Sequence, residues 1–170
     1  MISNEYIIEY AISLVKKYNT RNPFEIAKSL GINVIRWDGF SRLKGMYKVI
    51  KRNRYIFIND NLDENMSKIV CAHEIGHDLF HRALGENAML SETMLYDMTS
   101  RPEFEANLFA SELLLDTDEV LDLVYNYDYN ATQIAIKLNS DENLVAMKIA
   151  NLNRNGHNFR EPHIKSDFLK

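Results

Sequence analysis

The chain lacks the features that define several large classes of protein. Among its 170 residues there is one cysteine, Cys71, so no disulfide can form within the chain and no cysteine-rich zinc site exists. A lone thiol is typical of the reducing cytoplasm, where we expect the protein to act. The net charge of −4 and the pI near 5.7 do not favour a nucleic-acid-binding or membrane-surface protein.

Long apolar runs are absent as well. No stretch approaches the roughly 18 uninterrupted apolar residues of a transmembrane helix. Near the N-terminus, Glu5 and Glu9 interrupt the apolar run and no small-residue cleavage site follows it, so the segment does not resemble a signal peptide. What the chain does contain is 46% hydrophobic and 26% charged residues, a balance typical of a globular protein with a real core.

Hydrophobic spacing predicts a chain of helices with one region of strands. Helices are expected over residues 4–18, 23–30, 64–82, 101–115 and 118–125, and on both sides of a turn within 130–152. Ser100 and Glu103 are placed to form a capping box at the start of one of them. Strands are predicted over 32–36, 45–50 and 54–59, the last two forming a hairpin around the polar turn 51–53.

These elements fit a single domain over residues 1–155. We expect a core region over about 32–125, a C-terminal helical part over about 126–155 and a polar tail over 156–170. Residues 85–99 have no clean period and predict a mobile loop, which could serve as an active-site lid. The hairpin region is basic, with seven Lys or Arg against one Asp over residues 36–54, as in solvated hairpins whose edges are protected by lysine.

One motif carries chemistry, His73-Glu74-Ile75-Gly76-His77, in the middle of a predicted helix. His73 and His77 are four residues apart, so their imidazoles project from one face and can bind a single tetrahedral Zn²⁺. Glu74 lies roughly 100° round the helix, beside the metal. From there it can take a proton from zinc-bound water and hand it to the leaving amine. The alternative is a pair of core histidines with ordinary hydrogen-bond partners.

Zinc needs a third protein ligand, and Glu103 is the preferred candidate. The small residue Ala106 shares its helix face, as expected where two helices pack closely. Asn107, four residues on, could accept the other ring N–H of a zinc-bound histidine, which would orient the ring. Glu105 points about 200° away round the helix and is expected to face water. His81 lies a full turn beyond His77, so we expect it at the helix end or behind the ligands.

Three segments between Gly45 and Leu115 carry a family resemblance, through both their residues and their order and spacing. They are Ile58-Asn59-x-Asn61-Leu62, Cys71-Ala72-His73-Glu74-Ile75-Gly76-His77-x-x-x-His81 and Glu103-x-x-Ala106-Asn107-x-Phe109-Ala110-x-Glu112-Leu113-Leu114. In these segments the chain resembles the ImmA/IrrE family of zinc metallopeptidases. The resemblance implies that His73, His77 and Glu103 bind zinc and that Glu74 is the catalytic base. It also implies a mainly helical α+β fold, with a small antiparallel sheet beside a zincin-like HExxH helix and a second helix that carries a zinc ligand.

The small size of the chain resembles the ImmA type, the anti-repressor protease of mobile genetic elements. This implies a zinc-dependent endopeptidase whose protein substrate is an XRE-type helix-turn-helix repressor of a phage or integrative element, acting without direct contact to nucleic acid or membrane. One departure is that Leu115-Asp116 stand where many members have Met-Pro. That difference concerns the end of a helix and leaves the motif residues untouched.

Two other functions compete with the peptidase. A non-catalytic DNA-binding regulator is suggested by residues 130–152, which resemble a helix-turn-helix in outline. However, residues 126–170 hold six Lys or Arg and five Asp or Glu, far from a basic footprint. A zinc-binding scaffold without catalysis would need four closed protein ligands, and only three can be named here.

Overall fold

The computed structural model describes residues 2–86 and 100–160. The elements, in chain order, are α1 (Asn4–Tyr18), α2 (Pro23–Ser29), β1 (Asn33–Trp37), β2 (Gly45–Ile50), β3 (Asn53–Asn59), α3 (Glu64–Phe80), α4 (Arg82–Glu86), α6 (Arg101–Leu114), α7 (Thr117–Tyr127), α8 (Ala131–Lys137) and α9 (Glu142–Arg154). The mainly helical α+β fold class is therefore confirmed. Most of the predicted lid, residues 87–99, and residues 161–170 of the predicted tail lie outside the described residues.

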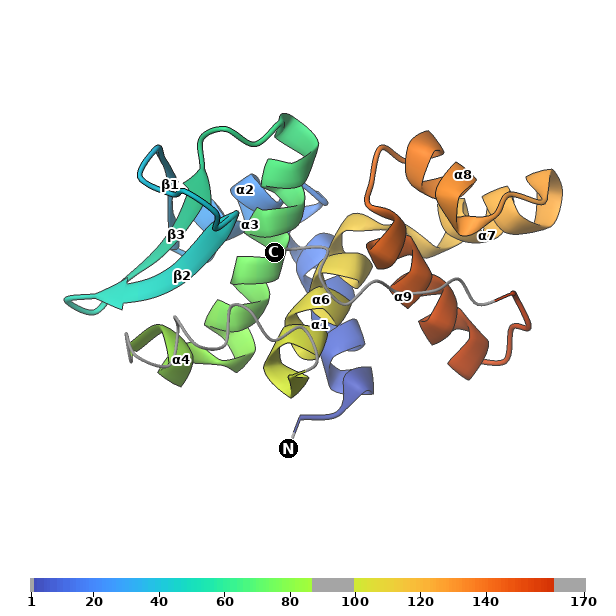
Figure 1. Ribbon diagram of the computed structural model, residues 1–170. Helices are drawn as coiled ribbons and strands as arrows, with labels where there is room; N and C mark the ends of the chain where they lie inside the picture. The colour runs from blue at the N-terminus through green and yellow to red at the C-terminus, as the bar shows by residue number, and fades with distance from the viewer. Residues whose placement is uncertain (1, 87–99, 161–170) are drawn as a thin grey trace.

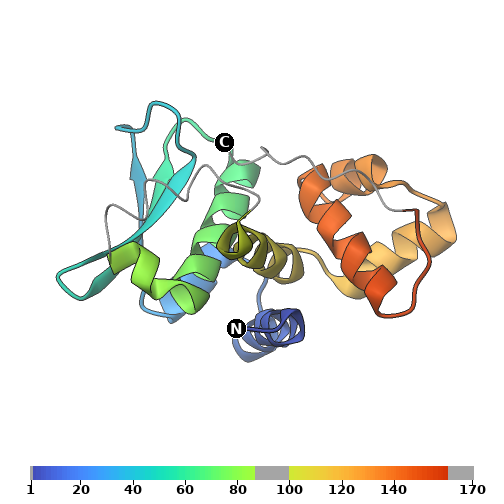
Figure 2. The same cartoon turned by 60° about the horizontal axis from the view of Figure 1, so that its bottom comes forward.

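The elements form three groups along the molecule (Figure 1). The sheet lies at one end, α7, α8 and α9 lie at the other, and α3 and α6 run side by side between them, with α1 against α6 (Figure 2). One continuous apolar core joins the groups. Its largest fully buried apolar side chains are Phe109, Ile7, Ile26, Ile56, Ile58, Ile75, Leu108, Leu113, Ile134 and Leu144.

The sheet has three strands in the order β1-β3-β2. The predicted hairpin is present, since β2 pairs antiparallel with β3. The expectation of an antiparallel sheet was wrong for the third strand, because β1 pairs parallel with β3, in a register that sets Asn33 opposite Tyr55. A strand of five residues carries no local signal of its direction. The direction follows from β2, which lies between β1 and β3 in the sequence but at the opposite edge of the sheet.

The hairpin turn is tighter than predicted. Ile50 pairs with Asn53, so only Lys51 and Arg52 form the loop. Both have left-handed backbones, with φ of 49° and 66°. Two-residue turns of this kind favour Asn-Gly, because a side chain at positive φ meets its own backbone. The left-handed conformation costs roughly 1–2 kcal/mol per ordinary residue. The chain therefore keeps two long cations where the backbone disfavours them.

Two helix starts differ in how they are capped. Asp63 accepts the backbone N–H of Met66 at 2.7 Å and begins α3. Ser100 occupies the N-cap position of α6 but makes no side-chain capping bond, so the predicted capping box was wrong. The reason lies in Glu103, whose carboxylate is turned toward His73 and His77 instead of back toward the helix start. Pro102, in the first turn, helps to start this helix instead.

The C-terminal helices are joined to α6 by a buried polar contact. Lys148 of α9 donates to Glu112 Oε2 at 2.5 Å, and Asn151 donates to Glu112 Oε1 at 2.9 Å. Lys148 and Glu112 are each 1% exposed. A buried charge pair is costly to break because removal of one partner leaves the other uncompensated. The pair therefore fixes α9 against the helix that carries Glu103.

None of the helices within residues 2–86 and 100–160 combines the length and the apolar character that a membrane span needs.

The strained turn gives a stability prediction. Replacing Lys51-Arg52 by Asn-Gly relieves two positive-φ side chains, so we expect the free energy of unfolding to rise by about 1–2 kcal/mol and Tm by roughly 2–6 °C. Thermal unfolding followed by circular dichroism measures the change. The matched control is Lys16→Gln with Lys17→Gln, which removes two exposed cations from α1 without altering backbone strain. A lower Tm for the Asn-Gly variant alone would contradict the strain argument.

Candidate metal centre

Three ligand atoms from two helices converge on one point. His73 Nε2 and His77 Nε2, both from α3, lie 3.0 Å apart. The Glu103 carboxylate of α6 lies 3.2 Å from each nitrogen, through Oε2 to His73 and Oε1 to His77. Ligand atoms about 2.0–2.1 Å from a tetrahedral zinc ion lie about 3.3 Å apart. With one Glu103 oxygen facing each histidine nitrogen, the three residues lie close enough together to share one ion.

The proton on His73 supports this geometry. His73 Nδ1 lies 2.7 Å from Asn107 Oδ1, an acceptor, so the neutral ring carries its proton on Nδ1 and leaves a lone pair on Nε2. That lone pair faces the Glu103 carboxylate, and Nε2 of His77 is also close. Electron-pair donors that converge in this way fit a shared cation. Among the described residues, His73, His77 and Glu103 form a group that could hold a metal ion.

Close packing of the two helices makes the cluster possible. A Cβ atom at Gly76 would lie 3.0 Å from Ala106 Cα and 3.3 Å from its carbonyl oxygen. Only glycine fits at that distance without moving α6. Gly76 lies between the two histidines in sequence, and Ala106 lies one turn beyond Glu103, so this contact sets the distance between the ligands on the two helices.

Burial determines the electrostatics of the ligands. Burial lowers the pKa of His77 to about 4, which favours the neutral ring that a metal requires. For Glu103, burial opposes ionisation, but the contacts with His73 and His77 outweigh it and hold the pKa of the carboxyl below its usual range. The two shifts have opposite effects on charge: the low pKa of His77 keeps the ring uncharged, and the low pKa of Glu103 keeps the carboxylate charged. Both favour metal-ligand forms of the side chains.

Glu74 lies beside the cluster and has unused hydrogen-bonding capacity. It is 3% exposed, and its Oε2 has no hydrogen-bond partner within the described part of the chain. Burial and the charge of Glu103 raise the pKa of Glu74 to about 7, against the opposing effects of His73 and the backbone amide of Tyr47. The side chain of Tyr47 is turned to Asp78, and burial, together with the Asp78 carboxylate, raises the pKa of the phenol above its usual range.

The start of β2 forms the other wall of the site. A small pocket of about 20 Å³, room for about one water-sized group, is lined by Leu43, Lys44, Gly45, Val70, His73, Glu74 and Glu103. Asn59 ties this wall in place, because its side chain donates to Leu43 O and its backbone N–H donates to Lys44 O, both at 2.9 Å. A Cβ atom at Gly45 would lie 2.2 Å from a methyl group of Val70, so the strand can pass this close to α3 only with glycine there.

The expectation that Glu105 faces water was wrong. Glu105 is 5% exposed, and its Oε2 lies 2.9 Å from His81 Nε2. Arg101 binds the other carboxylate oxygen and also donates to the backbone oxygen of Ile2 at 2.6 Å. The reason is that α6 is buried on more than one face, since α3 and α1 both pack against it. His81, at the end of α3, is thus held behind His77 by Glu105.

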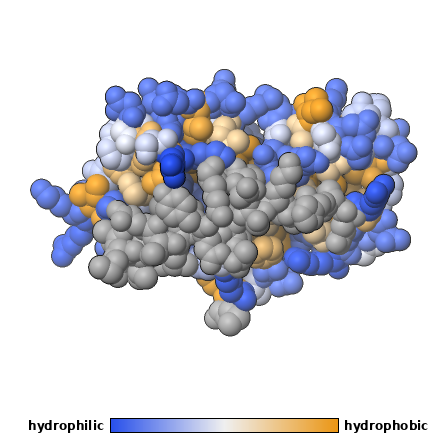
Figure 3. Space-filling model, viewed as in Figure 1, coloured by the Kyte–Doolittle hydropathy of each residue, from blue (hydrophilic) through white to orange (hydrophobic). Residues whose placement is uncertain are grey.

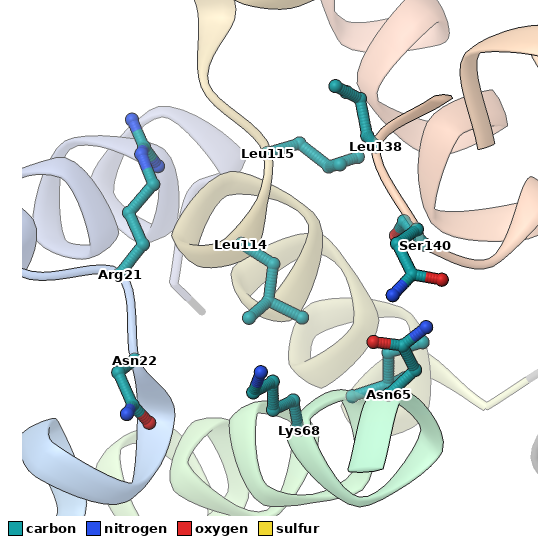
Figure 4. Close-up of a pocket in the computed structure, with 10 residues that line it drawn as sticks. Arg21, Asn22, Asn65, Lys68, Leu114, Leu115, Leu138 and Ser140 are labelled. Atoms are coloured by element: carbon teal, nitrogen blue, oxygen red, sulfur yellow. The ribbon is translucent and has the colours of Figure 1, made fainter. Parts of the chain in front are cut away.

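A larger pocket lies away from this cluster (Figure 4). Its volume is about 340 Å³, and it lies where the segment before α2, the start of α3, the end of α6 and the turn after α8 meet. Arg21 closes one side, since it donates to Glu112 O and Leu113 O and pairs with Asp116 at 2.7 Å. Leu114, Leu115 and Leu138 are among its lining residues, which mark it as a junction between packed elements.

Comparison with known proteins shows the family of this chain. Residues 27–150 match the profile of the Peptidase M78 family, described as the IrrE N-terminal-like domain. The chain belongs to the ImmA/IrrE family of metallopeptidases. It is 41% identical over 123 residues to "Uncharacterized immunity region protein 2" of Bacillus phage phi105, covering 72% of this chain and 76% of that protein. It is 32% identical over 131 residues to "Metallopeptidase ImmA" of Bacillus subtilis (strain 168), covering 75% and 74% respectively.

Membership of this family implies a metal ion, and the chemistry of the donor set fits zinc. Two imidazoles and one carboxylate are a ligand set of catalytic zinc sites, which keep a fourth position open for water or substrate. The Oε2 atom of Glu74, to which no described residue hydrogen-bonds, lies beside that cluster. A hydrogen bond from a zinc-binding histidine to an oxygen, here Asn107 Oδ1, is the usual means of orienting the ring.

We expect His73→Ala, His77→Ala and Glu103→Ala each to abolish stoichiometric zinc binding, because each removes one of three protein ligands. Asn107→Ala should keep the site but weaken its affinity for zinc by about 10- to 100-fold. Elemental analysis after dialysis and competition with a chelator measure both effects. Glu105→Ala is the matched control, an acidic residue two positions away on the same helix. Loss of zinc from the Glu105 variant, with zinc retained by the Glu103 variant, would show that Glu105 and not Glu103 is the third ligand.

Proposed function

We propose that the protein is a zinc-dependent endopeptidase that inactivates a helix-turn-helix repressor by cutting it. The observation that carries the proposal is the meeting of three metal-ligand atoms with the buried carboxylate of Glu74, in a chain of metallopeptidase ancestry. His73, His77 and Glu103 would hold the ion, and Asn107 would fix the ring of His73. A bound zinc ion supplies Lewis acidity toward the scissile carbonyl and the attacking water.

Glu74 performs the proton transfers. Its carboxylate accepts a proton from the water as the water oxygen bonds to the carbonyl carbon, and later gives that proton to the amine nitrogen as the carbon–nitrogen bond breaks. The free Oε2 is available for this exchange because no described residue hydrogen-bonds to it. The wall formed by Gly45 and Val70 limits the space around the carboxylate, so it stays directed at the site.

The substrate is expected to bind as an extended chain along β2. This strand is at the edge of the sheet, and Lys44 O bonds to the β3 side. The alternation of an antiparallel pair therefore turns the backbone groups of Gly45, Tyr47 and Val49 toward the edge away from β3. The same edge faces Glu74, whose pKa the Tyr47 amide lowers. An added strand would thus carry its scissile bond past the cluster by main-chain hydrogen bonds.

The proposal that the substrate is a repressor rests on the relatives and on the family resemblance. One relative is named for an immunity region of a phage and another as a metallopeptidase. The ImmA-type resemblance implies cleavage of the repressor of the same mobile element. Main-chain pairing is nearly independent of sequence, so selection of one protein requires contacts outside the cleft.

Direct DNA binding is the weaker candidate. In a helix-turn-helix the second helix enters the major groove. The corresponding helix here is α9, in which every residue from Asn143 to Ile149 is buried, with Lys148 paired to Glu112 of α6. One of the two cations of that helix, Lys148, therefore faces the protein interior instead of a phosphate backbone.

Glu74→Gln should keep the fold and the bound zinc but lose about 10²- to 10⁴-fold in turnover, because the amide is nearly isosteric and cannot act as a base. Zinc content, circular dichroism and peptide-bond cleavage are measured on the same preparation. Glu64→Gln, an exposed position on the same helix, is the control and should keep parental activity. Parental turnover in the Glu74 variant would remove that residue from the mechanism.

Substrate choice is tested by mixing the zinc-loaded protein with the repressor encoded beside it and, separately, with casein. We expect cleavage of the repressor at one or a few sites, abolished by a chelator and restored by zinc, and at most slow cleavage of casein. Gel electrophoresis and mass spectrometry of the products identify the cuts. Zinc-dependent cleavage of casein alone, with the repressor intact, would reject the specific regulator and leave a peptidase of broad specificity.

A further inference from the structure

A cationic groove lies at the far end of the β2–β3 hairpin from the metal centre. Its volume is about 560 Å³, and its lining residues are Val49, Lys51, Arg52, Arg54, Arg82 and Glu86. The hairpin tip projects at the left of the molecule in Figure 1, and in the same view the surface at that end is strongly hydrophilic (Figure 3). The groove therefore opens where the hairpin extends into solvent.

The groove has more positive than negative charge. Arg54 pairs with Asp78 at 2.7 Å, and Arg82 shares the same carboxylate at 3.9 Å. No carboxylate of residues 2–86 or 100–160 forms an ion pair with Lys51 or Arg52. The groove thus has four cations and two nearby carboxylates, Asp78 and Glu86. Lys51 and Arg52, at the tip, are the cations whose charge no ion pair among the described residues offsets.

The backbone at the tip gives an independent reason to assign these two cations a role. Lys51 and Arg52 occupy the two positive-φ positions of a turn in which Asn-Gly would be less strained. Backbone strain concentrates where a protein uses the strained residue. The retained cations stand at the exposed rim of a groove that already contains two guanidinium groups.

The groove is aligned with the proposed path of the substrate. β2 begins at Gly45, which lines the metal-site pocket, and ends at Ile50, immediately before Lys51. At roughly 3.3 Å per residue, the tip lies roughly 20 Å along the strand from the reacting centre. A chain extended along the edge of β2 would span that distance with about six residues.

We propose that this groove binds an acidic segment of the protein substrate, about six residues from the scissile bond. This proposal rests on the proposed function and supplies the contact outside the cleft that such a peptidase needs. Carboxylates suit the groove because arginine forks pair with them. A nucleic-acid strand suits it less, since the groove offers no aromatic ring for stacking and its two carboxylates would repel closely spaced phosphates.

The first test measures binding without catalysis. A fluorescein-labelled hexaglutamate peptide is titrated with the protein, followed by anisotropy, with hexaglutamine as the uncharged probe. We expect binding of hexaglutamate only, weakened about three- to tenfold by Lys51→Asn with Arg52→Gly and unchanged by Lys16→Gln with Lys17→Gln. The tip variant is expected to fold at least as well as the parent, so lost binding cannot be attributed to unfolding.

Equal binding of hexaglutamate by the parent and the tip variant, or no binding by either, overturns the proposal. Tighter, tip-dependent binding of a thymidine oligonucleotide would also overturn it, in favour of nucleic acid.

The second test uses the neighbouring repressor as substrate. The tip variant should raise KM by about three- to tenfold with kcat unchanged, and the difference should shrink at high salt, where exposed charges are screened. The α1 variant should match the parent. An unchanged KM in the tip variant overturns the proposal. If the parent itself leaves the repressor intact, the proposed function fails, and the peptide titration still decides whether the groove binds acidic chains.

Discussion

The contact between Gly76 of α3 and Ala106 of α6 is the constraint on which the rest of the site depends. Two helices can approach to this distance only where one of them has no side chain. The approach brings Glu103 within 3.2 Å of both histidine nitrogens and Asn107 within 2.7 Å of His73 Nδ1. Wider spacing would separate the ligands, and the buried carboxylate of Glu103 would then lose the partners that keep it charged.

The supports of α6 extend this constraint through the molecule. At its start, Arg101 joins Glu105, and Glu105 joins His81 at the end of α3. At its end, Glu112 is held by Lys148 and Asn151 of α9. The helix that carries one metal ligand is thus fixed at both ends by buried polar contacts. These contacts give the C-terminal helices a structural part in the site, because α9 fixes the orientation of α6.

Local patterns predicted the elements but not all of their relations. Apolar spacing and turn residues located α1, the hairpin and α3 to within a few residues, because helical and strand periods are properties of short stretches. The direction of β1 was missed because parallel pairing with β3 depends on a distant strand. The prediction of a capping box at Ser100 was wrong for the same kind of reason. The sequence offers Glu103 a local partner at the helix start, but in the folded chain its carboxylate faces the histidines of another helix.

The sequence alone determined the i, i+4 pair of His73 and His77 and the place of Glu74 between them, since one helical turn fixes both. The sequence also favoured Glu103 among the acids of α6, but the partner of each acid needed the tertiary structure. Glu103, Glu105 and Glu112 are all buried, yet one faces the histidines, one faces His81 and one faces Lys148. Periodicity on a helix gives the angle between side chains but not which neighbouring helix lies at each angle. That is set by the packing of α1, α3 and α9 around α6, which no single stretch of the sequence encodes.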